Sequence, residues 1–169
     1  MTRTILLATD DGQDPAYGEM REPVLRWAAS QEAHVVLYDR SAESYFVDPY
    51  PSGPWTADVE GGPERRAVLD PRQLEMLGRH YLAEQVRAAR GAGVRAGGWL
   101  PSRPGARGMA DAVSAVGADL VILPASVSRP SLFDRVRGNT LDGFREALSV
   151  PVVVADRSGV STGSTVPAG

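Results

Sequence analysis

The sequence predicts a single α/β domain built on an open parallel sheet. Short apolar runs without polar alternation recur along the chain, and such runs are typical of strands covered on both faces. Amphipathic helical patterns separate the runs, so successive strands are expected to be parallel and joined by right-handed crossovers. With 169 residues and 43% hydrophobic content, the chain can bury one core of ordinary size.

The apolar runs predict four strands, which are Ile5–Ala8, Val35–Tyr38, Leu120–Leu123 and Val152–Ala155. The first predicted helix is short and runs from about Pro23 to Gln31, because Gly18 and Pro23 interrupt any earlier helical pattern. These elements account for the two ends of the domain.

Three further helices follow from capping signals and periodicity. One begins after the N-cap Asp70, carries an apolar stripe, and ends at Gly91. Another runs from about Ala106 to Val116 and ends at Gly117. The last carries Leu141, Phe144 and Leu148 and cannot continue past Pro151.

Two segments do not fit the alternation of strands and helices. Ser41–Leu69 contains four prolines together with Tyr45, Phe46, Tyr50 and Trp55, and we expect it to pack over the carboxyl edge of the sheet. There it either fills the cleft with its own side chains or covers a ligand, and partial self-filling is the prediction, since four exposed aromatics would form a sticky patch. The tail Ser158–Gly169 is small and polar and is predicted to be disordered.

Composition excludes several classes of function. A net charge of −3 provides no broad cationic surface for nucleic acid or acidic lipid. All 18 basic residues are arginine and cysteine is absent, which rules out lysine Schiff bases, thiolate nucleophiles, disulfides and Cys-type zinc sites. The opening apolar run is too short for a signal peptide or a membrane span, so a cytoplasmic protein is expected. No nucleophile with its base stands out, so we expect a protein that is not an enzyme.

Four features together resemble the universal stress protein family. They are ILLATD at the first strand, VVLYD at the second, GADLVIL before the long loop, and Gly138 followed thirteen residues later by Pro151 and Val152. The resemblance covers nearly all of Thr4–Asp156. It implies an adenine nucleotide alpha hydrolase-like fold, with a five-stranded parallel sheet in the order 3-2-1-4-5. It also implies a stress-response function and a homodimer joined through the strand Pro151–Ala155, an apolar edge that invites pairing.

In nucleotide-binding members of that family, the loop after the fourth strand has the pattern G-x-x-G, nine residues, then G-Ser/Thr. Here Pro124 stands at the first glycine position, or Ala125 and Ser128 stand at the two positions when the count runs back from Gly138. Both early glycines are therefore absent, and a proline has no N–H to offer a phosphate. Gly138 matches the last glycine, Asn139 replaces the serine or threonine, and Asn139 is expected to cap the final helix.

The other positions implied by the resemblance lie at the ends of the first two strands. Asp10 matches an aspartate that contacts the nucleoside, although it is also a normal turn or capping residue. Asp39 matches a valine beside the adenine, where a charge would be desolvated at a cost or would change the site. The candidate site, a degenerate nucleotide site, is Thr9, Asp10, Asp39, Pro124, Ala125, Ser128, Gly138, Asn139 and Thr140.

The sequence therefore predicts a dimer that binds ATP weakly or not at all, needs no cofactor or metal, and acts through contacts with a client protein. Two alternatives remain open. One is an ATP or AMP sensor, with Mg²⁺, whose phosphate loop has been rebuilt with arginine and asparagine donors. The other is a binder of a different small ligand under the 41–69 segment.

Overall fold

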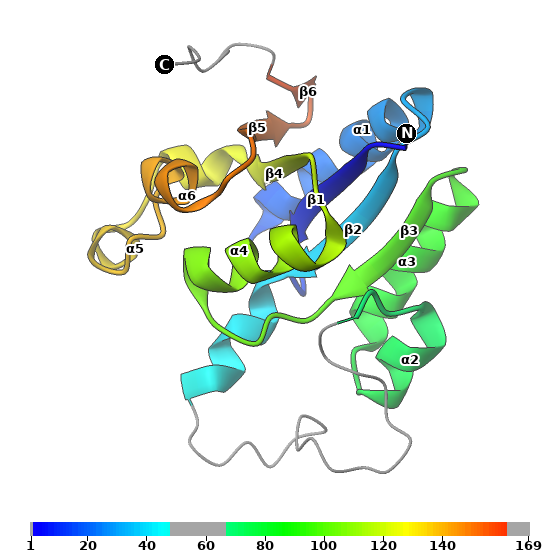
Figure 1. Ribbon diagram of the computed structural model, residues 1–169, viewed down its shortest axis with the longest axis horizontal. Coiled ribbons are helices and arrows are strands. Elements are labelled where there is room, and N and C mark those ends of the chain that lie inside the picture. Colours follow the sequence, from blue (N-terminus) through cyan, green and yellow to red (C-terminus); the bar gives the residue numbers. More distant parts are fainter. Residues whose placement is uncertain (1, 48–66, 162–169) are drawn as a thin grey trace.

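The computed structural model describes residues 2–47 and 67–161. Its sheet has the strand order β3-β2-β1-β4-β5-β6 (Figure 1). The strands are β1 (Thr4–Thr9), β2 (His34–Asp39), β3 (Arg95–Trp99), β4 (Leu120–Pro124), β5 (Val152–Asp156) and β6 (Gly159–Val160). The first five pair in parallel, which confirms the predicted fold class and the order 3-2-1-4-5. The four strands predicted from apolar runs are all present.

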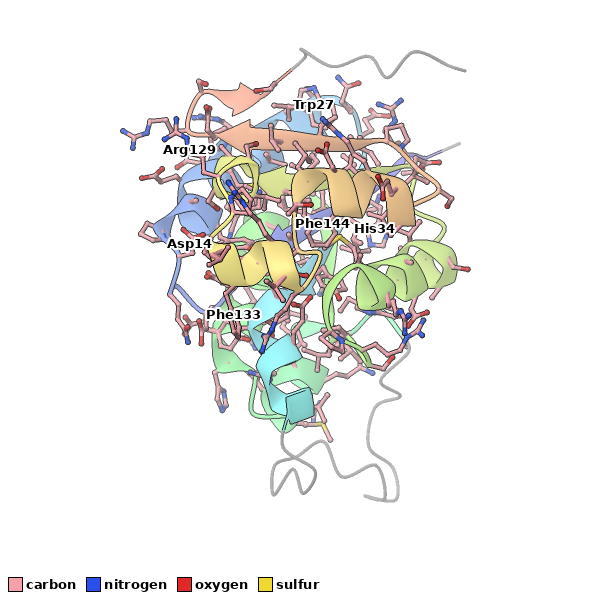
Figure 2. All side chains as sticks on the ribbon, turned by 90° about the vertical axis from the view of Figure 1, so that its left-hand side faces the viewer. Asp14, Trp27, His34, Arg129, Phe133 and Phe144 are labelled. Atoms are coloured by element: carbon pink, nitrogen blue, oxygen red, sulfur yellow. The ribbon has the colours of Figure 1, made fainter. Side chains whose placement is uncertain are left out.

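Helices cover both faces of the sheet (Figure 1). They are α1 (Pro15–Ser30), α2 (Pro71–Met76), α3 (His80–Gly91), α4 (Gly105–Val116), α5 (Leu132–Val136) and α6 (Leu141–Ala147), with the 3₁₀ helices η1 (Arg40–Val47) and η2 (Ala125–Ser128). On one face lie α1 and α3, whereas α4 and α6 pack together on the other. Helix α6 buries Phe144 completely and contacts β5 (Figure 2). None of the helices in the described ranges has the length and apolar character needed to cross a membrane.

Helix α1 begins eight residues before the predicted start at Pro23, so that prediction is wrong. Asp14 caps the helix by accepting a hydrogen bond from the Ala16 N–H, and Pro15 occupies the first turn, where a missing N–H costs nothing. Pro23 lies inside the helix and is tolerated because one face of α1 is anchored in the core. The buried residues of that face are Tyr17, Met20, Val24, Leu25 and Ala28.

The single helix predicted between Asp70 and Gly91 is two helices. Helix α2 ends at Met76, and Gly78 then adopts a φ of +73°, a conformation that favours glycine. Helix α3 begins at His80. The apolar stripe continues across this break, because Leu77 remains in the core, and the periodicity alone therefore does not reveal it.

Strand β3 has no counterpart among the predicted apolar runs, because its centre is Gly97 and Gly98. Both glycines allow another segment to approach closely. A Cβ atom on Gly97 would lie 2.3 Å from Cγ1 of Val68, and Leu69 exchanges two backbone hydrogen bonds with Gly98, at 2.9 and 2.8 Å. The residues that return from the 41–69 segment therefore pair with the edge of the sheet.

The tail prediction is wrong for residues 158–161, and residues 162–169 lie outside the described residues. Strand β6 turns back after Asp156 and pairs antiparallel with β5, with Ala155 opposite Val160. The Ser161 N–H also donates to the Val154 carbonyl oxygen at 3.0 Å. The carboxyl-terminal part of the outer β5 edge is therefore covered by the chain itself.

Candidate functional site

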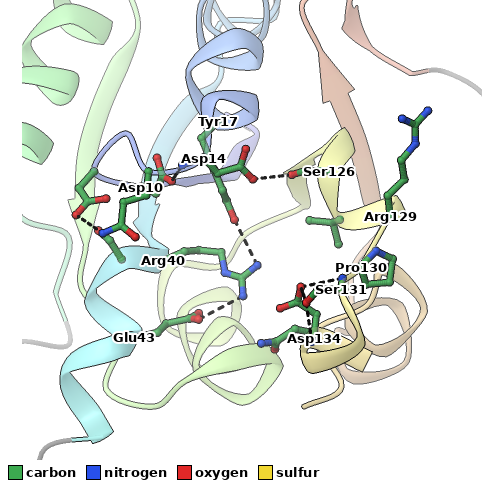
Figure 3. Close-up of a pocket in the computed structure, with 15 residues that line it drawn as sticks. Asp10, Asp14, Tyr17, Arg40, Glu43, Ser126, Arg129, Pro130, Ser131 and Asp134 are labelled. Atoms are coloured by element: carbon green, nitrogen blue, oxygen red, sulfur yellow. Dashed lines mark hydrogen bonds and ion pairs between the residues drawn. The ribbon is translucent and has the colours of Figure 1, made fainter. Parts of the chain in front are cut away.

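A pocket of about 530 Å³ lies at the carboxyl ends of β1 and β4 (Figure 3). The connection after β1 leads towards β2 and the connection after β4 leads towards β5, so the strand order reverses here, as it does at ligand sites of open α/β sheets. Four segments line it. The lining residues are Asp10, Asp11, Gln13, Asp14, Tyr17, Arg40, Ser41, Glu43, Ser126, Val127, Arg129, Pro130, Ser131, Asp134 and Asn139.

The turn between β1 and α1 is held by two carboxylates. Asp10 is buried and accepts hydrogen bonds from the backbone N–H groups of Gly12 and Asp14, each at 2.9 Å. Asp14 in turn accepts from the Ala16 N–H at 2.9 Å. Three N–H groups at the positive end of helix α1 are thus satisfied by the chain's own anions.

The loop after β4 is fixed in a similar way. The Ser126 hydroxyl donates to Oδ2 of Asp14 at 2.9 Å, and the buried side chain of Val127 closes the floor of the pocket. Ser131 and Asp134 form a capping box, in which the Ser131 N–H and hydroxyl both donate to Oδ2 of Asp134, at 3.1 and 2.6 Å. The hydrogen bond from Ser131 lowers the pKa of Asp134, so an ionised carboxylate stays at this side of the pocket.

The stretch from Gly138 to Thr140 leads into α6. Gly138 has a φ of +72°, and its N–H points to the Arg135 carbonyl oxygen at 3.3 Å. The Asn139 N–H donates to the Asp134 carbonyl oxygen at 2.9 Å. The prediction that Asn139 caps α6 is wrong, because Thr140 is the N-cap and accepts from the Gly143 N–H at 3.0 Å. Helix α6 therefore begins one residue later than predicted.

Arg40 stands at the wall of the pocket opposite this loop. Its guanidinium contacts Oε2 of Glu43 at 3.3 Å and the Tyr17 hydroxyl at 3.4 Å, and it lies 5.1 Å from the centre of the Phe144 ring. Burial opposes the Arg40 charge, but Tyr17 and Glu43 outweigh it and raise the pKa of the guanidinium. For Tyr17 the effect of burial is the reverse, because it disfavours the ionised phenolate and so raises the pKa of the hydroxyl. This cluster ties η1 to α1 and α6.

Asp10 and Asn139 are the predicted site residues that line the pocket. Pro124 ends β4, and Ala125, Ser128, Gly138 and Thr140 lie in the segment that follows, but none of these five residues lines the pocket. Their neighbours Ser126, Val127 and Ser131 face the pocket instead, because the 3₁₀ turn η2 and the helix α5 set which side chains point inwards.

Thr9 and Asp39 lie elsewhere. The Thr9 hydroxyl donates to Oε1 of Gln85 at 2.6 Å and accepts from Nη2 of Arg21 at 2.9 Å. Asp39 is fully buried and accepts hydrogen bonds from Ser41 and from the Tyr81 hydroxyl.

The side chain of Asp39 therefore serves the packing of α3. It does not line the pocket, and its carboxylate is removed from solvent, which is one of the two outcomes expected for a charge at this position. Burial raises the pKa of Asp39, and the donors Ser41 and Tyr81 and the Arg79 guanidinium oppose that effect.

Sequence reasoning missed Arg40, Tyr17, Glu43, Ser131 and Asp134. A signal existed for two of them, since Ser131-x-x-Asp134 is a readable capping box. The predicted position of Tyr45, Phe46, Tyr50 and Trp55 concerns side chains outside the described residues. The first part of that segment does reach the pocket through Ser41 and Glu43.

Charge gives the pocket its chemical character. Five carboxylates line it (Asp10, Asp11, Asp14, Glu43, Asp134), against two arginines (Arg40, Arg129). Across residues 2–47 and 67–161, no three His, Cys, Asp or Glu side chains are grouped so that they could hold a metal ion. The surface of the pocket therefore favours polar or cationic groups over a polyphosphate.

Comparison with known proteins identifies similar folds among solved structures. No protein family matches the chain by sequence, and no curated protein matches it either. Solved structures do match. A universal stress protein in complex with cAMP has a TM-score of 0.53 at 16% identity, and the match covers 92% of this chain and 98% of that one.

Two further structures agree with this result. The universal stress protein from Archaeoglobus fulgidus in complex with dAMP has a TM-score of 0.50 at 17% identity, over 91% of this chain and 98% of that one. A universal stress protein family member from Burkholderia pseudomallei has a TM-score of 0.52 at 18% identity, over 90% and 95%. The chain is thus an α/β protein with a pocket at the switch point of its sheet. Its fold is that of the universal stress proteins.

Proposed function

We propose that this chain is a non-enzymatic universal stress protein that does not bind adenine nucleotides tightly and acts through contacts with other proteins. The observation that supports this proposal most is that backbone N–H groups around the pocket are already hydrogen-bonded to carboxylates. The N–H groups of Gly12, Asp14, Ala16 and Ser131 each donate to a carboxylate of the chain itself. A phosphate would have to displace these carboxylates from the N–H groups. Displacement is unfavourable because each charge-assisted hydrogen bond contributes about 1.5–3 kcal/mol.

The neighbouring donors are also in use. The N–H groups of Gly138 and Asn139 donate to carbonyl oxygens within the loop, and Pro124 has no N–H. Two of the similar structures hold cAMP and dAMP, so proteins of this fold can bind an adenine nucleotide. In this chain the carboxylates of Asp10, Asp14 and Asp134 accept the backbone hydrogen bonds that a phosphate would need.

A second candidate function is the binding of a small molecule other than a nucleotide. It is favoured by the volume of the pocket, about 530 Å³, and by its lining of five carboxylates and two arginines. A space of this size accommodates a small metabolite, and its charge favours one that carries a cationic group.

Native mass spectrometry of the protein purified from its natural source distinguishes these functions, because a ligand that remains bound adds its mass to that of the polypeptide. The proposal expects a mass equal to that of the polypeptide alone. A co-purifying mass that matches AMP, ATP or cAMP would contradict it, and a different small mass would favour the second candidate.

Assembly and location belong to the same proposal. We infer a cytoplasmic homodimer joined along β5, whose apolar outer edge would otherwise remain partly unpaired. Because β6 already pairs with Ala155 and Asp156, a second copy would use the amino-terminal part of β5 or displace β6. Light scattering at tens of micromolar protein tests the dimer, and a mass equal to one chain would contradict it.

A further inference from the structure

Helix α5 carries an apolar surface that packs on nothing in the described structure. Leu132, Phe133 and Val136 are 79%, 64% and 80% exposed, and no residue of α5 is buried. We call these three side chains the α5 patch. They are three of the five large hydrophobic side chains that are exposed within the described ranges, gathered in little more than one helical turn. Such clustering marks an interaction surface more often than a scatter of single residues does.

The chain holds this helix in place although its apolar side chains gain nothing from the core. A helix of five residues is unstable in isolation. Here the Ser131–Asp134 capping box fixes its start, and the Asn139 N–H donates to the Asp134 carbonyl oxygen at 2.9 Å after its end. Figure 2 shows the helix at the outer surface with Phe133 on it. The α5 patch is therefore presented on a fixed support.

Exposed arginines lie next to the patch along the chain. Arg129, Arg135 and Arg137 are all exposed, and the Arg137 guanidinium lies 4.1 Å from the centre of the Phe133 ring. The acidic residue of the helix, Asp134, turns away to Ser131 and the pocket (Figure 3). The rim is thus positive on a chain whose net charge is −3. Phenylalanine and arginine are both among the residues enriched at protein interfaces.

We propose that the α5 patch is a docking site for an acidic, apolar segment of a partner protein. The inference rests on the proposed function, in which the chain acts through protein contacts, and it names the surface and the chemistry of the partner. Apolar side chains of the partner would cover Leu132, Phe133 and Val136, while its Asp and Glu side chains would pair with Arg129, Arg135 and Arg137.

Two other occupants fit less well. A second copy of the chain, paired patch to patch across a two-fold axis, would bring the arginines of both copies together. A lipid surface would meet only three apolar side chains on a chain of net negative charge, far less than the apolar face of a membrane-surface helix.

Selection from a random dodecapeptide phage library against the intact chain tests the proposal. Three forms of the protein are compared: the wild type, the triple variant Leu132→Ser/Phe133→Ser/Val136→Ser, and Met76→Ser. Met76 is 61% exposed on α2, so its variant is the matched control for loss of an exposed apolar side chain. Because every altered side chain is exposed, all three forms should melt at the same temperature.

We expect enriched peptides that combine Leu, Phe or Trp with Asp or Glu. They should bind the wild type and Met76→Ser equally, bind the triple variant at least about tenfold more weakly, and weaken with added salt. Enrichment of neutral or basic peptides, equal binding to the triple variant, or no enrichment would overturn the proposal. Two further results would overturn the proposal. One is flotation with phosphatidylglycerol vesicles by the wild type but not by the triple variant, and the other is a dimer that forms in the wild type but not in the triple variant. The selection contains no nucleotide, so its outcome is independent of ATP binding.

Discussion

The hydroxyl of Ser126 donates to the carboxylate of Asp14 at 2.9 Å, and this bond joins the loop after β4 to the start of α1. It crosses the switch point of the sheet, the place where open α/β sheets commonly bind ligands. Asp14 also caps α1 through the Ala16 N–H. One carboxylate thus fixes both sides of the pocket.

Replacing Asp14 by Ala should destabilise the fold by about 1–2 kcal/mol, because α1 loses its N-cap and the Ser126 hydroxyl loses its acceptor. Ser126→Ala should cost less, about 1 kcal/mol, since the cap remains. Urea denaturation followed by circular dichroism measures both. Asp11→Ala is the control, because Asp11 lines the same pocket but is exposed. A cost for Asp11→Ala as large as that for Asp14→Ala would contradict this account.

Asp39 should make stability depend on pH. Burial raises the folded-state pKa of Asp39 above its ordinary 3.8, so between the two values the folded state binds more protons than the unfolded state. The free energy of unfolding contributed by this group therefore falls as pH rises from about 4 towards the folded-state pKa. Asp39→Asn should remove that fall.

Urea denaturation at a series of pH values between 4 and 8 checks this expectation. The stability of the wild type relative to Asp39→Asn should decrease as pH rises. An increase would show instead that the donors Ser41 and Tyr81 stabilise the ionised carboxylate by more than its burial costs. Asp11→Asn, which alters an exposed carboxylate, serves as the reference.

Asp134→Ser should improve the binding of anions to the pocket. The substitution removes a carboxylate and leaves the Ser131 N–H available for a phosphate oxygen. We expect ATP to bind at least several-fold more tightly than to the wild type, while the loss of the capping box costs about 1 kcal/mol of stability. Asp142→Ser removes the same charge from α6, outside the pocket, and should leave ATP binding unchanged. If both substitutions tightened ATP binding equally, the change in net charge alone would explain the effect, and the freed Ser131 N–H would not.

The edge of β5 yields a prediction about assembly. Gly159 has a φ of +113°, which proline cannot adopt, so Gly159→Pro should detach β6 and uncover the β5 edge. If copies pair along β5, this variant should dimerise more tightly than the wild type in sedimentation velocity runs, and Val153→Arg should dimerise less. An unchanged dimer in both variants would place the contact elsewhere.

Much of the fold could be predicted from the sequence because buried parallel strands have continuous apolar runs. Such runs form the centres of four strands, β1, β2, β4 and β5. The exceptions have local causes. Strand β3 pairs in parallel with β2, but its centre is Gly97 and Gly98, so it has no apolar run that would reveal it. The break at Gly78 lies within a continuous apolar stripe, and Asp14 with Pro15 starts α1 despite the later Pro23.

The site was harder to predict than the fold. A motif aligned Asp10 and Asn139 with the pocket, but which loop side chains face inwards depends on η2 and α5, which no motif contained. Asp39 shows the same limit, since the last residue of β2 turns to Tyr81 on α3. Arg40 reaches the pocket only because η1 begins directly after that strand.

Isothermal titration calorimetry of the wild-type chain with ATP and magnesium tests the central claim most directly. The carboxylates of Asp10, Asp14 and Asp134 already accept from four backbone N–H groups in and beside the pocket, those of Gly12, Asp14, Ala16 and Ser131. This arrangement predicts no measurable heat of binding at ligand concentrations up to several hundred micromolar, a range that corresponds to binding weaker than about −5 kcal/mol. A dissociation constant in the low micromolar range, with a stoichiometry of one nucleotide per chain, would contradict it.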